Sequence, residues 1–168
     1  YGYREVGQEY LQNVLNTDKK LDAYDSGRIY YYLGDYQKAY LALEEAKGKG
    51  GVDSYLYLGK AYAATGDYNY ASSVYSNYLS KQGPDAEIYN QLGLCELAKK
   101  DYQKALEAFQ AGKQIEGNSL MQTLSFNEIV AYEYLQDYQK AAVLLKAYLQ
   151  NYPDDQAAIR EQQFLSTR

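Results

Sequence analysis

A short string recurs four times along the chain at a nearly constant interval, and this repetition restricts the possible folds more than any other feature. The copies lie at 34–39 (GDYQKA), 66–71 (GDYNYA), 100–105 (KDYQKA) and 136–141 (QDYQKA), with a degraded copy at 2–6. Their shared tyrosines, at positions 3, 36, 68, 102 and 138, are 33, 32, 34 and 36 residues apart. A period of this length indicates supersecondary units that stack, because one unit alone cannot bury its apolar face.

Each string predicts a turn followed by a helix. Its aspartate stands where an N-cap carboxylate accepts a backbone N–H of the first turn. Gly34 and Gly66 can adopt the left-handed conformation that ends the preceding helix. The alanine four residues after each aspartate is small enough to let two helices approach closely. Upstream of the strings, apolar residues recur at i, i+3, i+4 and i+7, as at positions 55, 58, 59 and 62, so a first helix precedes each turn.

The predicted fold is therefore all-α, an α-solenoid of antiparallel helix pairs in a single domain spanning residues 1–168. Gly- and Pro-containing breakers at 48–51, 83–84, 117–119 and 153–154 separate the pairs. The expected segments are a half-repeat helix at 1–19, repeats at 20–51, 52–85, 86–117 and 118–153, and a capping helix at 154–168. We expect the half-repeat to belong to a unit that continues N-terminally. In the capping helix, Ala157, Ala158, Ile159 and Leu165 are expected to face the stack.

The composition argues against catalysis and against nucleic-acid binding. The chain has no histidine, which removes the commonest general base, and Cys95 is its only cysteine. We therefore expect no enzyme activity, no cofactor and no metal site, and we expect Cys95 to be a buried structural thiol. A net charge of −5 fits poorly with duplex nucleic acid, which attracts clustered Lys and Arg. No apolar run approaches the ~20 residues of a membrane span, so this segment is not expected to insert directly into a membrane.

The repeats resemble the tetratricopeptide repeat (TPR) family, whose pattern is W-x2-L-G-x2-Y, then A-x3-F, then P. The second unit matches with Tyr55, Leu58, Gly59 and Tyr62, followed by Ala71 and Tyr75. The first unit departs at Ala23 and Ser26, and the fourth at Glu128 and Ile129, where Leu and Gly are expected. The resemblance implies a right-handed superhelix in which the first helices line a concave groove that binds extended peptides or helices.

Placing each unit on the family pattern gives a candidate peptide-binding groove. Its residues are Tyr24, Arg28, Tyr31, Tyr57, Lys60, Asn90, Gln91, Asn127 and Tyr134. Further positions on the same faces are Tyr32, Asp53, Leu56, Glu87, Leu94, Thr123, Phe126 and Val130. Tyrosine offers rigid contact area and asparagine can pair with a peptide backbone, although any one tyrosine could instead pack between neighbouring first helices. The Lys and Asn clamp for a terminal carboxylate, used by one TPR subgroup, is absent here.

The leading hypothesis is a non-catalytic protein–protein interaction scaffold whose partner is a protein or peptide. Two alternatives stay open: a self-assembly module, and a glycan-binding surface of a cell-envelope protein, in which tyrosines would stack on sugar rings. The sequence leaves the oligomeric state open. It also leaves the compartment open between the cytoplasm and an exported or lipid-anchored state.

Overall fold

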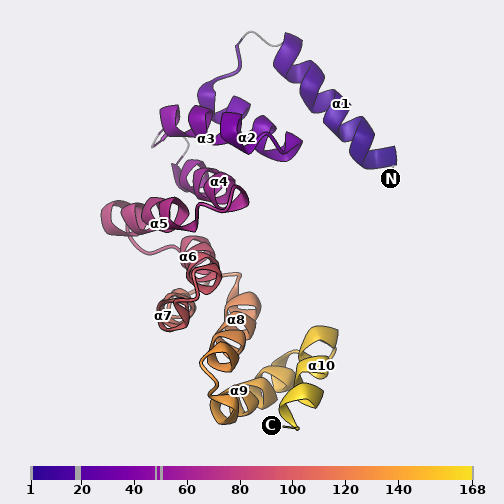
Figure 1. Ribbon diagram of the computed structural model, residues 1–168, viewed down its shortest axis with the longest axis vertical. Helices are drawn as coiled ribbons and strands as arrows, with labels where there is room; N and C mark the ends of the chain where they lie inside the picture. The colour runs from indigo at the N-terminus through magenta and orange to yellow at the C-terminus, as the bar shows by residue number, and fades with distance from the viewer. Residues whose placement is uncertain (1, 18–19, 48, 50, 168) are drawn as a thin grey trace. The chain divides into compact units, whose positions relative to one another are not determined.

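A computed structural model describes residues 2–17, 20–47, 49 and 51–167, and within them the chain forms ten α-helices and no strand (Figure 1). This confirms the all-α prediction. The helices are α1 Gly2–Thr17, α2 Ala23–Leu33, α3 Tyr36–Glu45, α4 Gly51–Ala64, α5 Tyr68–Gln82, α6 Ala86–Ala98, α7 Tyr102–Lys113, α8 Met121–Tyr134, α9 Tyr138–Asn151 and α10 Gln156–Leu165. The chain divides into two compact units, unit 1 (Tyr1–Lys81) and unit 2 (Gln82–Arg168). We call α2–α3, α4–α5, α6–α7 and α8–α9 pairs one to four.

The recurring string builds the same turn inside every pair, as predicted. Its aspartate carboxylate accepts a hydrogen bond from the backbone N–H three residues on, at 3.0–3.3 Å; the four caps are Asp35, Asp67, Asp101 and Asp137. The residue before the aspartate is left-handed in each case, with φ of 82° at Gly34 and 84° at Gly66. Lys100 and Gln136 take the same conformation, with φ of 64° and 62°, although neither is glycine.

We expect the change of Gln136 to glycine to stabilise unit 2 by roughly 0.5–1 kcal/mol. The left-handed conformation costs a residue with a side chain about 1 kcal/mol or more, and glycine avoids this cost. Part of the gain is offset because glycine has more conformational entropy to lose from the unfolded state. Urea unfolding followed by circular dichroism would measure the gain. Gly66→Gln is the matched control and should lower the midpoint. A Gln136→Gly midpoint at or below that of the parent chain would contradict the expected strain.

The two helices of a pair are held together by a glycine on the first helix and a large side chain on the second. A Cβ added to Gly93 would lie 2.7 Å from both Cδ1 and Cζ of Phe109, and one added to Gly59 would lie 2.6 Å from the Tyr75 hydroxyl. Phe109 and Tyr75 are completely buried, and their rings occupy the space that a side chain at the glycine would need. The string alanines are also fully buried, at positions 39, 71, 105 and 141. The predicted close approach of the helices is thus confirmed.

In pair four, the first helix carries a larger residue and the second helix a smaller one than in pairs two and three. Ile129 stands at the glycine position and Leu145, sixteen residues later, stands where pairs two and three have a ring. Both residues are 1% exposed and share one apolar cluster. The departure at Ile129 is therefore compensated by a smaller facing side chain, which keeps the interface filled.

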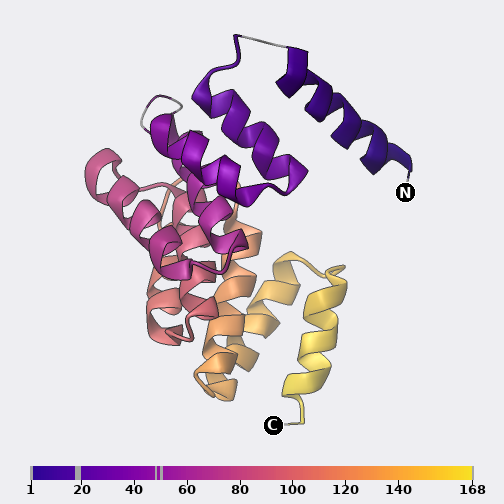
Figure 2. The same ribbon diagram turned by 45° about the horizontal axis from the view of Figure 1, so that its top comes forward.

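Helix α10 lies alongside α9 in both ribbon views (Figures 1 and 2). Ala158 and Leu165 are buried against the α9 core, as expected for a capping helix, but Ala157 is exposed and the expectation for it was wrong. Asp155 fixes the start of α10. It caps the Ala157 and Ala158 N–H groups and accepts a 2.5 Å hydrogen bond from the Tyr148 hydroxyl of α9.

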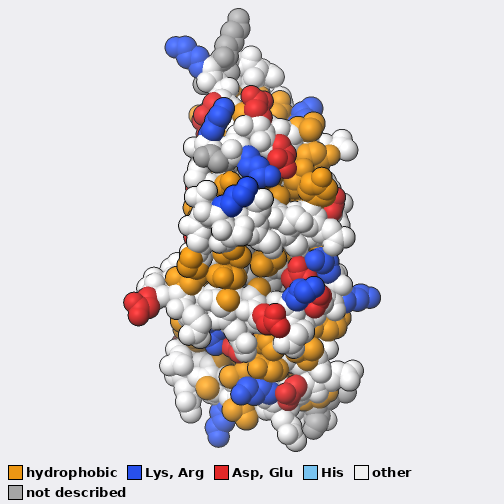
Figure 3. Space-filling model, turned by 90° about the vertical axis from the view of Figure 1, so that its left-hand side faces the viewer, with side chains coloured by type: hydrophobic (Ala, Val, Ile, Leu, Met, Phe, Trp, Pro, Cys, Tyr) orange, Lys and Arg blue, Asp and Glu red, His pale blue; other side chains and the backbone are white. Residues whose placement is uncertain are grey.

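The surface carries mixed charge. On the face drawn in Figure 3, Lys and Arg side chains are interspersed with Asp and Glu side chains instead of forming one basic patch. Among the described residues, no helix is both long enough and apolar enough to span a bilayer.

Candidate functional site

In unit 1, the first helices α2 and α4 bring an arginine and several tyrosines together. The Arg28 guanidinium lies 5.3 Å from the ring centroids of both Tyr24 and Tyr57, so one ring comes from its own helix and one from α4. Its nearest acidic partner is Asp25, at 4.0 Å and exposed, which is a weak ion pair. Within the described part of the chain, no group accepts a hydrogen bond from the buried Arg28 Nε. The two rings and Asp25 surround this cation, and its Nε remains without an acceptor among the described residues.

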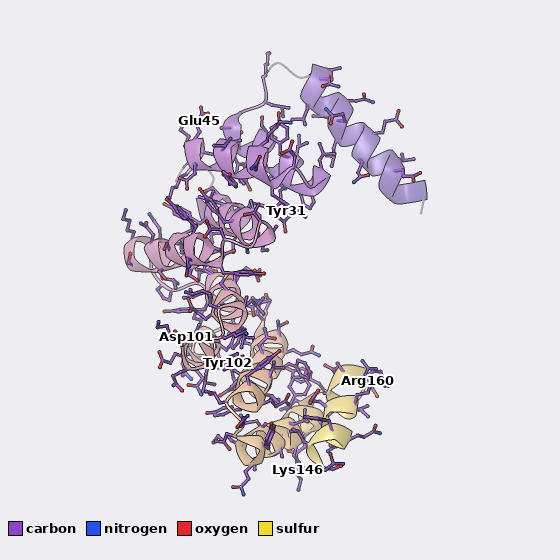
Figure 4. The ribbon with its side chains drawn as sticks, in the orientation of Figure 1. Tyr31, Glu45, Asp101, Tyr102, Lys146 and Arg160 are labelled. Atoms are coloured by element: carbon purple, nitrogen blue, oxygen red, sulfur yellow. The ribbon has the colours of Figure 1, made fainter. Side chains whose placement is uncertain are left out.

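Two more tyrosines extend this cluster along α2. Tyr31 packs edge-on against Tyr57 with ring centroids 5.5 Å apart, and Figure 4 shows it on the side of α2 towards α4. Tyr32 is 55% exposed, and its hydroxyl lies 2.6 Å from that of Tyr57. We call Tyr24, Arg28, Tyr31, Tyr32 and Tyr57 the tyrosine–arginine cluster. Its rings are partly packed between the two helices and partly exposed.

Three phenols of the cluster, those of Tyr24, Tyr31 and Tyr32, have raised pKa values. Burial raises the pKa of Tyr24, and its hydroxyl donates to the Asp53 carboxylate at 3.4 Å. The hydrogen bond with Tyr57 raises the pKa of Tyr32, which Lys60 and Arg28 oppose by their charge. Lys60 therefore lies near enough to act on the cluster. Protonated phenols can donate as well as accept hydrogen bonds, which suits recognition of a peptide backbone.

In unit 2, the first helices α6 and α8 are joined through two of the predicted groove residues. The Asn127 side chain donates to the Asn90 carbonyl oxygen at 2.9 Å. Asn90 is only 5% exposed, so most of its surface is already covered by the protein. Gln91 donates to Glu87 one turn earlier on the same helix, at 2.9 Å. The amide pair gives this face a fixed lateral spacing between its two helices.

Four other predicted groove positions lie outside both the tyrosine–arginine cluster and the Asn90–Asn127 pair. Tyr134 is 54% exposed and stacks on Tyr102 of α7, with centroids 4.9 Å apart, so it contacts a second helix. Phe126 packs towards Tyr148 of α9 at 5.7 Å, inside the helix pair. Leu56 is buried, whereas Leu94 is 40% exposed. Unit 1 therefore presents the denser candidate site.

A three-ring stack lies elsewhere in unit 1, between α3, α4 and α5. The Tyr62 ring stacks on Tyr40 at 4.6 Å and on Tyr70 at 5.0 Å. Burial and the nearby Glu44 carboxylate raise the pKa of Tyr62 to about 12. Tyr70 stands where the other strings have a lysine, so its ring here replaces the Lys–Asp ion pair seen at Lys38 in pair one. We interpret this stack as interhelical packing.

Two side chains outside the candidate site, Cys95 and Glu133, have strongly raised pKa values. Cys95 is 4% exposed, and burial raises its pKa to about 12, so the thiol stays protonated and unreactive at neutral pH, which confirms its structural interpretation. Burial, together with the charge of Glu161, raises the pKa of Glu133 to about 7. Glu133 of α8 therefore lies close enough to Glu161 of α10 for the two carboxyls to interact. Among the described residues, no group of three or more metal-ligating side chains converges.

Comparison with known proteins identifies the repeat. Two tetratricopeptide repeat profiles match residues 56–119 and 126–155, which together cover more than half of the chain. The chain belongs to the tetratricopeptide repeat family. A TPR relative, tetratricopeptide repeat protein 21B of Xenopus laevis, is 28% identical over 153 residues. This match covers 90% of the chain but only 10% of that relative, so the chain spans about a tenth of its length.

Solved structures share the TPR fold. A crystal structure of MamA matches with a TM-score of 0.74 and 21% identity, covering 85% of this chain and 78% of that one. MamA from Desulfovibrio magneticus RS-1 matches with a TM-score of 0.71 and 20% identity, over 92% and 89%. The second TPR domain of human RPAP3, solved with an HSP70 peptide, matches with a TM-score of 0.58 and 16% identity, over 66% and 90%.

Pair four departs from the TPR pattern in a way that creates a buried charge pair. Glu128 occupies the leucine position and is 6% exposed. Its carboxylate accepts from Lys113 Nζ at 2.6 Å and from Gln110 at 2.9 Å, both on α7. A second departure, Ser125 at the aromatic position of the pattern, escaped the sequence analysis. The signal was available, because Ser125 lies four residues before Ile129, as Tyr55 lies four before Gly59.

Proposed function

We propose that this chain is a protein-interaction scaffold that holds a peptide segment on the faces of its first helices. The tyrosine–arginine cluster of unit 1 is the principal contact, with Lys60 beside it. The single observation that supports this choice is Arg28, a cation within 5.3 Å of two tyrosine rings whose buried Nε has no hydrogen-bond acceptor among the described residues. Tyrosine and arginine are also the residue types that dominate binding energy at interfaces.

The peptide-bound RPAP3 domain supports a peptide as the type of ligand. The exposed Tyr32 and the half-buried Tyr24 offer rigid area that loses little entropy on binding. The amide pair of Asn90 and Asn127 is proposed as a secondary contact, since a side-chain amide can meet both the N–H and the C=O of an extended backbone.

The proposal is tested by selecting displayed random peptides on the purified chain and measuring their affinity by fluorescence anisotropy. Arg28→Ala is expected to weaken binding of the selected peptides by about tenfold or more, since a central arginine at an interface contributes about 2 kcal/mol. Tyr57→Ala should have a similar effect, and circular dichroism would verify that both variants keep their helices.

The matched control is Lys146→Ala, an exposed cation on the second helix of pair four (Figure 4). It removes a positive charge without touching a first helix, so affinity should stay within a factor of about two of the parent chain. Equal loss in Arg28→Ala and Lys146→Ala would mean that only net charge matters, and the proposed face would be wrong.

The same purified chain can be tested for the two alternatives, self-association and glycan binding. Light scattering over a concentration series reports a self-assembly module as a rising mass. A glycan array reports sugar recognition, which the Tyr70 end of the three-ring stack would carry. A positive result in either assay without any selected peptide would replace the peptide proposal.

A further inference from the structure

Pair four lacks an aromatic residue at the position four residues before the glycine position, where pairs two and three have a tyrosine. In pair two the position is Tyr55, which is 7% exposed and packs edge-on against Tyr78 at 5.1 Å. In pair three it is Tyr89, whose Cβ lies against Gly112. In pair four it is Ser125, which is smaller by a whole ring.

A cavity of about 240 Å³ lies beside Ser125. Ser125, Glu128 and Ile129 of α8 form one wall, Leu144 and Tyr148 of α9 form another, and Lys113 of α7 contributes to the rim. Pockets for drug-sized ligands measure roughly 300–1,000 Å³, so this one suits a single ring. Its wall combines the apolar Ile129 and Leu144 with the Ser125 hydroxyl and the Glu128 carboxylate.

The surrounding side chains are fixed in ways that prevent collapse into the space. Tyr148, which is equivalent in position to Tyr78, is 4% exposed, and its hydroxyl is bonded to Asp155. Its ring contacts Tyr152 at 4.8 Å. Glu128 is held by its bond to Lys113. These contacts hold Tyr148 and Glu128 in place beside Ser125.

Pair one also lacks an aromatic residue at this position, but it lacks the second-helix residues that would line a cavity. Its aromatic position is Ala23, but α3 ends at Glu45, and the position equivalent to Tyr148 is the small, buried Ala46. In pair four the second helix continues to Asn151, so the walls remain although the ring is missing. Pair four therefore combines a full-length second helix with no aromatic side chain at position 125.

We propose that this cavity binds a phenol-type aromatic ring supplied from outside the chain, with the ring between Ile129 and Leu144 and the hydroxyl donating to Glu128. Each Glu128 oxygen accepts one bond from the protein and retains a second lone pair for such a donor. The site lies in pair four and does not depend on the peptide-binding face proposed for unit 1.

The test is a titration of the full chain with p-cresol, followed by methyl NMR. Saturable shifts are expected at Ile129 and Leu144 with a dissociation constant in about the millimolar range, as befits a ligand of so few atoms. Leu106, in a separate apolar cluster, is the reference and should not shift. Toluene, which lacks the hydroxyl, should bind several-fold more weakly. Absence of saturable shifts, or equal binding of toluene, would overturn the proposal.

Matched variants locate the site. Ser125→Tyr restores the internal ring of pairs two and three and should reduce p-cresol affinity at least tenfold, whereas Ser125→Ala keeps the space and should retain binding. Arg28→Ala should leave p-cresol binding unchanged, which separates this site from the unit 1 face. Undiminished binding to a folded Ser125→Tyr variant would contradict the assignment. N-acetyl-tyrosinamide distinguishes the sources: if it also binds, a peptide tyrosine can enter, and if only p-cresol binds, the ligand is a free phenol.

Discussion

Replacing Gly93 by alanine is expected to destabilise the chain by about 1–3 kcal/mol, the usual range for overpacking a closed core. The new Cβ would lie 2.7 Å from two carbons of the Phe109 ring, which is completely buried and cannot move aside. In an exposed helix the same change would stabilise by up to about 1 kcal/mol, so the sign of the effect is diagnostic. Urea unfolding monitored by circular dichroism measures it.

Gly7→Ala provides the matched control. Among the described residues, nothing beyond the local helix backbone lies within 4 Å of a Cβ added to Gly7, so this helical glycine should tolerate alanine without loss of stability. Phe109→Leu in the Gly93→Ala background makes room for the methyl group and should recover part of the loss, as Leu145 does opposite Ile129 in pair four. A Gly93→Ala variant at least as stable as its parent would refute the close approach of α6 and α7.

Removing Lys113 is expected to cost about 3–5 kcal/mol, because its partner would remain as a buried charge. The Glu128 side chain is 8% exposed and receives a 2.6 Å hydrogen bond from Lys113. Methionine at position 113 keeps the length of the side chain but supplies neither charge nor donor. Gln110 continues to donate to one carboxylate oxygen, which is insufficient to replace the lost cation.

The double change Lys113→Met with Glu128→Leu should recover most of that loss, because it removes both charges and restores the leucine of the TPR pattern. Replacement of a buried ion pair by apolar side chains of similar size is often neutral or stabilising. Lys38→Met is the control, since its ion pair with Asp35 is exposed and should contribute 1 kcal/mol or less. Losses of similar size in Lys113→Met and Lys38→Met would contradict the buried pair.

The helices, the turns and the contact between the two helices of a pair were predictable because their signals are local and repeated. An aspartate cap, a left-handed glycine and a small alanine fall within six residues, and four copies fix the register. The candidate site was predictable only in part. Helical spacing places Tyr24, Arg28 and Tyr57 on facing first helices, but the identity of each contact depends on how far one helix is displaced along the other.

Contacts between neighbouring helices depend on how far one helix is displaced along the other, so they could not be predicted from the sequence. The Asn90–Asn127 bond joins residues 37 positions apart, and nothing in their local sequence distinguishes an amide that pairs internally from one that faces solvent. Lys100 and Gln136 adopt a conformation for which glycine is the usual signal, so the shared turn imposes it on them. Ser125 is visible as a departure, but whether a cavity follows depends on where Tyr148 is held.

The turn within each pair has a consequence for how such a chain can change over time. Its cap, its left-handed residue and its small contact residue are contiguous in sequence, so the coding segment for one helix pair already contains everything that the turn requires. In repeat arrays each unit contacts only its neighbours, so a segment of that length can be duplicated or lost without redesign of the others. A duplicated pair can then differ from its copies at one position, as pair four does at Ser125, while the copies preserve the fold.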